Sequence, residues 1–145
     1  MKLVVQRVKK AKVVRVSDNK VAGEIGLGLF VLVEFKKGDS EKEVEILAEK
    51  LSKLRVMSDS KDKMNLSVND TNGKMLVVSQ FTLYADTAGG NRPSFINAED
   101  PEKAKKLYEL FIASLRAKNL KVETGSFGDY MEIEAVLDGP VTILY

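Results

Sequence analysis

The segment that most constrains the fold of this chain is an apolar run from Lys74 to Val78. Apolar, β-branched residues behind the turn Asn72-Gly73 are typical of a strand packed inside a sheet. Polar side chains then interrupt the pattern at Ser79, Gln80 and Thr82, and each such group needs a hydrogen-bond partner if it is buried. The segment is therefore either an ordinary strand end whose polar side chains bond the backbone, or a strand end that carries a site.

Further strands are predicted on both sides of this segment. The runs Lys2–Val8 and Ala11–Val16 alternate well enough to form two strands or one long bent strand. Gly23, Gly26 and Gly28 are too closely spaced for a continuous strand and indicate a tight corner or a bulge. They do not form a dinucleotide-binding loop, because no helix follows them. The other predicted strands are Leu29–Phe35, Met64–Val68, Lys121–Thr124, Tyr130–Val136 and Val141–Tyr145.

Two helices are predicted between the strands. Ser40 and Glu43 form a capping box, and the apolar stripe behind it comprises Val44, Leu47, Ala48, Leu51 and Leu54. Asp100 is predicted to cap the second helix, with Pro101 at its first position. The buried stripe of that helix comprises Ala104, Leu107, Tyr108, Phe111 and Leu115. At 145 residues, the chain is expected to form one domain over residues 1–145.

The absence of histidine and cysteine limits the chemistry of any site. It excludes the commonest general base, a thiolate nucleophile and the usual zinc ligands, so we predict no metal site and no cofactor. The net charge of +2 is too small to indicate bulk attraction to nucleic acid, although it does not exclude a local basic patch. No apolar run reaches membrane-spanning length and no signal peptide is apparent, so we expect a cytoplasmic protein.

Two more segments have unusual composition. The loop Ala85–Asp100 holds Arg92-Pro93-Ser94-Phe95 and is either a solvated connector or a functional loop. Near the carboxyl end, Asp138-Gly139-Pro140 forms either a hairpin turn between two strands or a cis Gly139-Pro140 bond. A cis bond would turn two successive carbonyls outward, and such a pair of acceptors could hold an ammonium group.

Several short motifs, taken together, resemble one family. They are Gln6-Arg7-Val8, Lys63-Met64-Asn65-Leu66, Ser79-Gln80-Phe81-Thr82-Leu83, Gly90-Asn91-Arg92-Pro93-Ser94-Phe95, Thr124-Gly125 with Phe127 and Met131, and Gly139-Pro140-Val141-Thr142. In this order and spacing they resemble the D-aminoacyl-tRNA deacylase family over essentially the whole chain. The resemblance implies an α+β fold with a mixed or antiparallel, barrel-like sheet and two main helices. It also implies a homodimer with its active sites at the subunit interface.

The resemblance further implies a role for each motif. The catalytic stretch, which would line the pocket for the terminal aminoacyl-adenosine of D-aminoacyl-tRNA, comprises Ser79, Gln80, Phe81 and Thr82. Gly139 and Pro140 would enter that pocket from the partner subunit as a chiral filter that reads the α-amino group, with Arg7 holding the pair. Phe127 and Met131 match the adenine pocket.

The expected reaction needs little from side chains. An ester is already reactive, and a main-chain filter would reject L-amino acids by collision while accepting many D-residues and also glycine. From the residues alone Thr82 is the natural nucleophile, but no base stands beside it in any motif. The family pattern instead uses the 2′-hydroxyl of the terminal ribose, with backbone amides near Phe81 and Thr82 stabilising the oxyanion. Thr82 is then expected to bind or position the substrate rather than to attack it.

Two positions depart from the family pattern. Leu137 stands where the family usually has Asn, which affects the hydrogen bonding expected around the Gly-Pro pair. Gly128-Asp129-Tyr130 replaces the small residues usual between the Phe and Met positions, which affects the shape of the adenine pocket.

Two other functions remain open from the sequence. The chain could be a non-catalytic module that binds an RNA 3′ end, with Phe81, Phe95 and Phe127 stacking on bases and Arg92 contacting phosphate. It could also be a general serine or threonine esterase with a lysine such as Lys63 as base.

Overall fold

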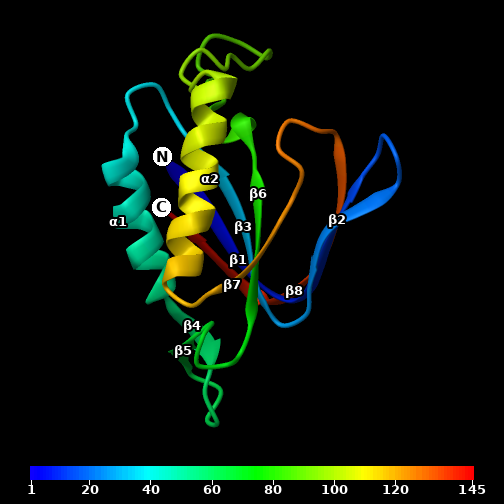
Figure 1. Cartoon of the computed structure of the whole chain (residues 1–145), viewed down its shortest axis with the longest axis vertical. Helices are drawn as coiled ribbons and strands as arrows, with labels where there is room; N and C mark the ends of the chain where they lie inside the picture. The colour runs from blue at the N-terminus through cyan, green and yellow to red at the C-terminus, as the bar shows by residue number, and fades with distance from the viewer.

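The computed structural model describes residues 1–145 as one mixed sheet, a small hairpin and two helices (Figure 1). The elements are β1 Lys2–Arg15, β2 Lys20–Ile25, β3 Gly28–Glu34, α1 Glu41–Ser52, β4 Arg55–Ser58, β5 Met64–Ser67, β6 Lys74–Ser79, the 3₁₀ helix η1 Phe81–Tyr84, α2 Pro101–Ala117, β7 Lys121–Thr124 and β8 Met131–Leu144. Neither α1 nor α2 combines the length and apolar character that a membrane-crossing helix requires.

The long strand β1 is the axis of the sheet. Of the two arrangements left open by the sequence, the single bent strand is the observed one. Its first half pairs antiparallel with β3, its second half pairs antiparallel with β2, and its other edge pairs with β8. The shift in register between Val13 and Val14 lies opposite Gly23 and Val21, where a glycine allows the close approach of a bulge. One strand thus fixes the positions of three others.

Two parallel pairings complete the sheet and explain the position of the helices. β6 pairs parallel with β3 on one side and with β7 on the other. Parallel neighbours need long crossover connections, and α1 and α2 occur in these two connections. Both helices consequently cover the same face of the sheet (Figure 1). β6 is buried from Met75 to Val78, as its apolar run predicted.

The helical predictions hold in most details. Ser40 and Glu43 form the predicted capping box of α1, and the buried residues of α1 are Val44, Ala48 and Leu51. The whole predicted stripe of α2 is buried. The cap of α2 was predicted incompletely, because Asp100 occupies the N-cap position without a hydrogen bond from its side chain. Pro101 begins this helix, and Glu99 rather than Asp100 accepts a nearby hydrogen bond, from the Asp100 amide at 3.1 Å.

The sheet curls until its edges nearly meet. A Cβ atom on Gly23 in β2 would lie 2.5 Å from the backbone oxygen of Thr124 in β7, so these two edge strands approach closely. The curl encloses a second apolar cluster, which comprises Val8, Ala11, Val13, Ile25, Phe30, Leu76 and Val78. The predicted α+β fold with a mixed, barrel-like sheet and two main helices is confirmed for the single chain.

One strand prediction is wrong. The sequence suggested separate strands Tyr130–Val136 and Val141–Tyr145, with a hairpin turn as the simpler interpretation of Asp138-Gly139-Pro140. Instead β8 runs as one strand along β1, from the pair Arg15–Met131 to the pair Val4–Leu144. The register jumps at Arg7, since Gln6 pairs with Thr142 while Val8 pairs with Leu137. Four residues of β8 therefore stand opposite one residue of β1, and we call residues 138–141 the excursion.

Candidate functional site

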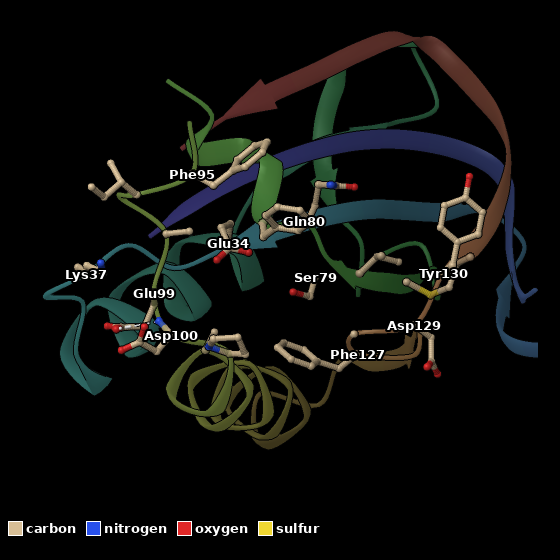
Figure 2. Close-up of a pocket in the computed structure, with 18 of the residues that line it drawn as sticks. Glu34, Lys37, Ser79, Gln80, Phe95, Glu99, Asp100, Phe127, Asp129 and Tyr130 are labelled. Atoms are coloured by element: carbon tan, nitrogen blue, oxygen red, sulfur yellow. Dashed lines mark hydrogen bonds between the residues drawn. The ribbon is translucent and has the colours of Figure 1, made fainter. Parts of the chain in front are cut away.

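A cavity of about 620 Å³ opens at the carboxyl ends of β3 and β6 (Figure 2). Crevices at this edge of parallel strands commonly bind ligands, because the loops that follow the strands diverge there. The first residues of α2 and the loop before β8 form the opposite wall. The lining residues are Glu34, Lys37, Val78, Ser79, Gln80, Phe81, Phe95, Ile96, Ala98, Glu99, Asp100, Pro101, Ala104, Phe127, Gly128, Asp129, Tyr130, Met131 and Ile133.

Three of the four predicted catalytic residues line this cavity. Ser79 ends β6 with its side chain directed into the cavity, and the backbone amide of Gln80 donates to the oxygen of Val33 at 2.9 Å (Figure 2). Gln80 Nε2 donates to Thr82 Oγ1 at 2.6 Å. Thr82 itself is exposed and is not among the lining residues. The segment after Ser79 was described from the sequence as a strand end, and the structure turns it into the 3₁₀ helix η1.

Phe81 packs against the long loop Ala85–Asp100, which the sequence left open as either a functional loop or a solvated connector. Its ring meets the ring of Phe95 edge to face, with centroids 4.9 Å apart. The loop is closed on itself by paired backbone hydrogen bonds between Asp86 and Ser94, each of 2.8 Å. Phe95 is thereby held over the cavity, and Arg92 stands on the exposed tip of the loop. The loop is therefore part of the cavity wall.

The two predicted adenine-pocket residues both lie in the cavity wall. The ring of Phe127 packs against the buried ring of Tyr108, with centroids 5.6 Å apart. Tyr108 donates from its hydroxyl to the backbone oxygen of Val77 at 2.8 Å, and its burial raises the pKa of this phenol. Met131 accepts at Sδ from the Ser126 amide at 3.2 Å. The wall is thus an apolar surface anchored to α2 and β6.

The segment between these residues departs from the family pattern and shapes the mouth of the cavity. Tyr130 is strongly exposed beside the opening (Figure 2). Asp129 contacts the Ser126 hydroxyl and lies 3.6 Å from a guanidinium nitrogen of Arg15. Gly128 has a φ of 80°, a conformation that favours glycine. The contacts of Asp129 thus hold this turn in place, while the ring of Tyr130 stays exposed to solvent.

A buried carboxylate that the sequence analysis missed lies at the floor of the cavity. Glu34 is 2% exposed, ends β3 and turns its carboxylate toward the open space (Figure 2). Burial raises its pKa to about 7, against the lowering effects of the Phe35 backbone amide and the N-terminal ammonium. The available signal was a single acidic residue at the end of the apolar run Leu29–Phe35. No functional motif includes it.

Ion pairs define the rim on the same side. Lys103 pairs with Glu99 at 2.6 Å, and its hydrogen bond lowers the pKa of that carboxyl. The Met1 ammonium contacts the carboxylate of Asp39, which also accepts from the Lys36 amide at 2.8 Å. These neighbouring acids already have cationic or amide partners. Glu34 differs from them in having no side-chain partner.

The excursion lies outside the cavity of its own chain. Its Gly139-Pro140 bond is cis, the second of the two arrangements left open by the sequence, and both residues are exposed. Arg7 donates from Nε to the Asp138 oxygen at 3.1 Å and from Nη1 to the Val56 oxygen at 2.8 Å. Arg7, Gly139 and Pro140 therefore lie together, and they lie outside the cavity that Ser79 lines. Leu137, at the position where the family usually has Asn, is exposed beside them.

The geometry does not favour the esterase with Lys63 as base. Lys63 lies in the turn between β4 and β5, where its backbone amide donates to Asp59 Oδ1 at 3.1 Å. It is not a lining residue of the cavity that holds Ser79. No group of three or more Asp or Glu side chains forms a metal site in the chain.

The fold and the cavity define an α+β protein with a pocket of small-ligand size where parallel strands end. The chain belongs to the D-Tyr-tRNA(Tyr) deacylase family, whose sequence model it matches over residues 4–145. It is 54% identical to a D-aminoacyl-tRNA deacylase of Thermotoga petrophila over 144 residues, which cover 99% of this chain and 95% of the relative. It is 52% identical, over the same shares of both chains, to a D-aminoacyl-tRNA deacylase of Koribacter versatilis.

Two solved structures share the fold. One, described as c-Myc DNA Unwinding Element Binding Protein, superposes with a TM-score of 0.91 at 38% identity, covering 100% of this chain and 97% of the other. The second, described as a probable eukaryotic D-amino acid tRNA deacylase, superposes with a TM-score of 0.87 at 14% identity, covering 99% and 97%. At that identity the second likeness concerns the fold alone.

Proposed function

We propose that this chain hydrolyses the ester bond of D-aminoacyl-tRNA in the cytoplasm, releasing the D-amino acid and free tRNA while sparing L-aminoacyl-tRNA. The observation that carries the proposal is the meeting of Ser79, Gln80 and Phe81 with Phe127 and Met131 in one cavity. Its volume of about 620 Å³ lies within the range of small-ligand pockets. The names and high identity of the relatives support the same reaction.

The cavity suits a reaction in which water is the nucleophile and the substrate itself assists the attack on the ester. Thr82 has no base beside it, and its hydroxyl already accepts from Gln80. The terminal ribose would therefore supply assistance through its 2′-hydroxyl. The first amides of η1, at Phe81 and Thr82, have no acceptor within that short helix, so they are free to stabilise the oxyanion. In this proposal Thr82 positions Gln80 and the η1 backbone.

Chiral selection is proposed to come from the excursion of a second copy of the chain. Gly139 and Pro140 present backbone without bulky side chains, and they lie too far from their own cavity to line it. Exposed apolar side chains on β8 support a homodimer that would bring the two together, and they are Ile133, Val136, Leu137 and Leu144. Arg7 would hold the excursion through Asp138. Glycyl-tRNA would also be accepted, because glycine has no side chain to collide.

The first experiment compares the release of amino acid from D-tyrosyl-tRNA, L-tyrosyl-tRNA and glycyl-tRNA, beside an enzyme-free control. Rapid loss of the D and glycyl esters with the L ester spared is expected. Decay of all three at the control rate, with tRNA still bound, would leave a binding module instead. The observation that favours this second candidate is that one 38% identical relative is described as a DNA-element binding protein.

A complementation experiment tests the partner's contribution. Ser79→Phe fills the cavity and Gly139→Ala alters the excursion, so each variant alone should be inactive. If the excursion acts in trans, a mixed dimer contains one intact site made of one good cavity and one good excursion. Random mixing in equal amounts should then restore about a quarter of the wild-type activity. No recovery from mixed dimers that are shown to form would require the two parts to act within one chain.

A further inference from the structure

Four carboxylates line the cavity, Glu34, Glu99, Asp100 and Asp129, and the proposed reaction uses none of them. Glu34 is the one that is both buried and without an ion pair. Glu34 is the last residue of β3 and directly follows Val33, which pairs with Ser79 at the end of β6. It therefore lies beside the strand end that carries the proposed site. Its carboxylate faces the cavity that Ser79 and the ring of Phe127 also line (Figure 2). An ionisable group placed this deeply needs a polar partner when it is charged.

The protein supplies very little to this carboxylate. The backbone amide of Phe35 favours its charged form, and no side chain donates to it. The nearby charges are the Met1 ammonium and the Asp39 carboxylate, which are already paired with each other. On the rim, Glu99 is paired with Lys103, while Lys37 and Asp100 face the outer part of the cavity. A ligand is therefore the available donor.

The walls around Glu34 suit a flat ring. Phe127 and Phe95 present aromatic surfaces, and Val78 and Ala104 add aliphatic ones. Aromatic faces stack on nucleobases, while a single polar group at the end of such a slot can read the hydrogen-bonding edge of the base. A neutral carboxyl carries one O–H donor beside one acceptor. Adenine offers the complementary pair, an exocyclic amine beside an unprotonated ring nitrogen.

We infer that Glu34 is a specificity-determining residue that reads the adenine base of the substrate's terminal adenosine from the cavity floor. Its carbonyl oxygen accepts from the exocyclic amine, and its hydroxyl donates to the adjacent ring nitrogen. This inference rests on the proposed function, because it takes the terminal adenosine to be the occupant of the cavity. The role differs from that of Phe127 and Met131, which supply apolar surface.

The ionisation of Glu34 gives this contact a pH dependence. Burial raises its pKa to about 7, so a neutral carboxyl is present in much of the protein near neutral pH. Above that pH the carboxylate still accepts from the amine, but it loses its donor and repels the lone pair of the ring nitrogen. Binding of adenine is therefore expected to weaken as the pH rises through about 7.

The test measures binding of the ribotrinucleotide CCA and of an analogue whose last base is purine, which lacks the exocyclic amine. Titration calorimetry at pH 6 and pH 8.5 compares wild type with Glu34→Gln, Glu34→Leu and the control Glu109→Gln on the exposed face of α2. Wild type should bind CCA roughly fivefold more tightly than the analogue at pH 6, since a net hydrogen bond contributes about 1 kcal/mol. That preference should shrink at pH 8.5.

The variants separate a base contact from a structural role. Glu34→Gln should keep the preference for CCA and lose its pH dependence, because an amide carries a donor and an acceptor at every pH. Glu34→Leu should bind both trinucleotides equally. Wild type with no preference, or with no binding at all, would overturn the inference. If CCA binding follows these expectations but D-tyrosyl-tRNA is not hydrolysed, only the enzymatic proposal fails. If D-tyrosyl-tRNA is hydrolysed but CCA is not preferred over the purine analogue, only the role of Glu34 fails.

Discussion

Arg7 and Asp138, separated by most of the chain, form a double contact. Arg7 Nε lies 3.1 Å from the backbone oxygen of Asp138 and 3.1 Å from its carboxylate oxygen Oδ2. The Arg7 side chain is only 10% exposed, and its Nη1 also donates to Val56 at 2.8 Å. One guanidinium thus joins β1, β4 and the excursion at a point where ladder pairing between β1 and β8 is interrupted.

Replacing Arg7 should loosen the excursion. Arg7→Met leaves the oxygens of Val56 and Asp138 without their donor, so the free energy of unfolding should fall by about 2–3 kcal/mol. Hydrolysis of D-tyrosyl-tRNA should fall as well. The stability and activity of Arg7→Lys should lie between those of wild type and Arg7→Met, because an ammonium lacks the planar fork of a guanidinium. Urea denaturation measures the first effect. Arg15→Met, which removes exposed pairs with Asp18 and Asp129, should lower the free energy of unfolding much less, and equal losses in both variants would contradict this role of Arg7.

Glu34 should make stability depend on pH. Its pKa is raised in the folded protein to about 7, from an ordinary value of 4.5, so its contribution is fully present below about pH 4.5 and is lost as the pH rises through 7. Glu34→Gln has no such loss. Relative to wild type, the free energy of unfolding of this variant should therefore increase by about 3 kcal/mol between pH 4.5 and pH 8. Thermal and urea unfolding across this range measure the gain, with Glu109→Gln as the control. A constant difference would show that Glu34 is not desolvated.

Two nearby glycines should respond very differently to the same methyl group. A Cβ on Gly28 would lie 1.8 Å from the Lys74 oxygen, whereas a Cβ on Gly26 would have no neighbour within 4 Å. Gly28→Ala should therefore force β3 and β6 apart, lower the free energy of unfolding by about 3 kcal/mol or more, and weaken hydrolysis through the displacement of Ser79. Gly26→Ala should change stability by less than about 1 kcal/mol. Similar denaturation midpoints for the two variants would mean that the strands separate at little cost.

Thr82 is expected to be dispensable as a nucleophile. Thr82→Val removes the hydroxyl that accepts from Gln80, and hydrolysis of D-tyrosyl-tRNA should fall by no more than about tenfold, the loss of one hydrogen bond. Thr82→Ser should restore it. Single-turnover kinetics distinguish the cases, because loss of a true nucleophile abolishes the chemical step. A loss of several thousandfold in the rate of hydrolysis, with tRNA binding intact, would mean that Thr82 is the nucleophile after all.

Local patterns predicted most of the elements because their signals are local. The capping box at Ser40, the stripe on α2 and the run before Ser79 depend on neighbours within a few residues, and all are observed. The hairpin expected near Gly139 failed for the opposite reason. A turn and an excursion from a continuous strand have the same local composition, and only the partner strand decides between them. Here that partner is β1, more than 120 residues earlier in the chain.

The cavity was predicted in part for the same reason. Ser79, Gln80, Phe81, Phe127 and Met131 belong to short motifs that a resemblance can match, and they meet in the cavity. Glu34 belongs to no motif, and its importance arises only when the ends of β3 and β6 are placed side by side. The sequence also grouped Thr82 with its neighbours, but the turn into η1 directs it away from the cavity. Side-chain direction at a strand end depends on the turn that follows.

The pairing of β1 on both edges has a consequence for insertions and deletions. Gln6 pairs with Thr142 on one edge and with Phe30 on the other, and Phe30 pairs with Leu76. A single transverse row thus links the residue that follows the excursion to the strand that carries Ser79. An added residue in β1, β3 or β6 would slide one segment by about 3.3 Å and reverse its faces. Added residues in the turns at 59–63 or 86–94 would leave the row intact. Length variation among related chains should therefore concentrate in those turns.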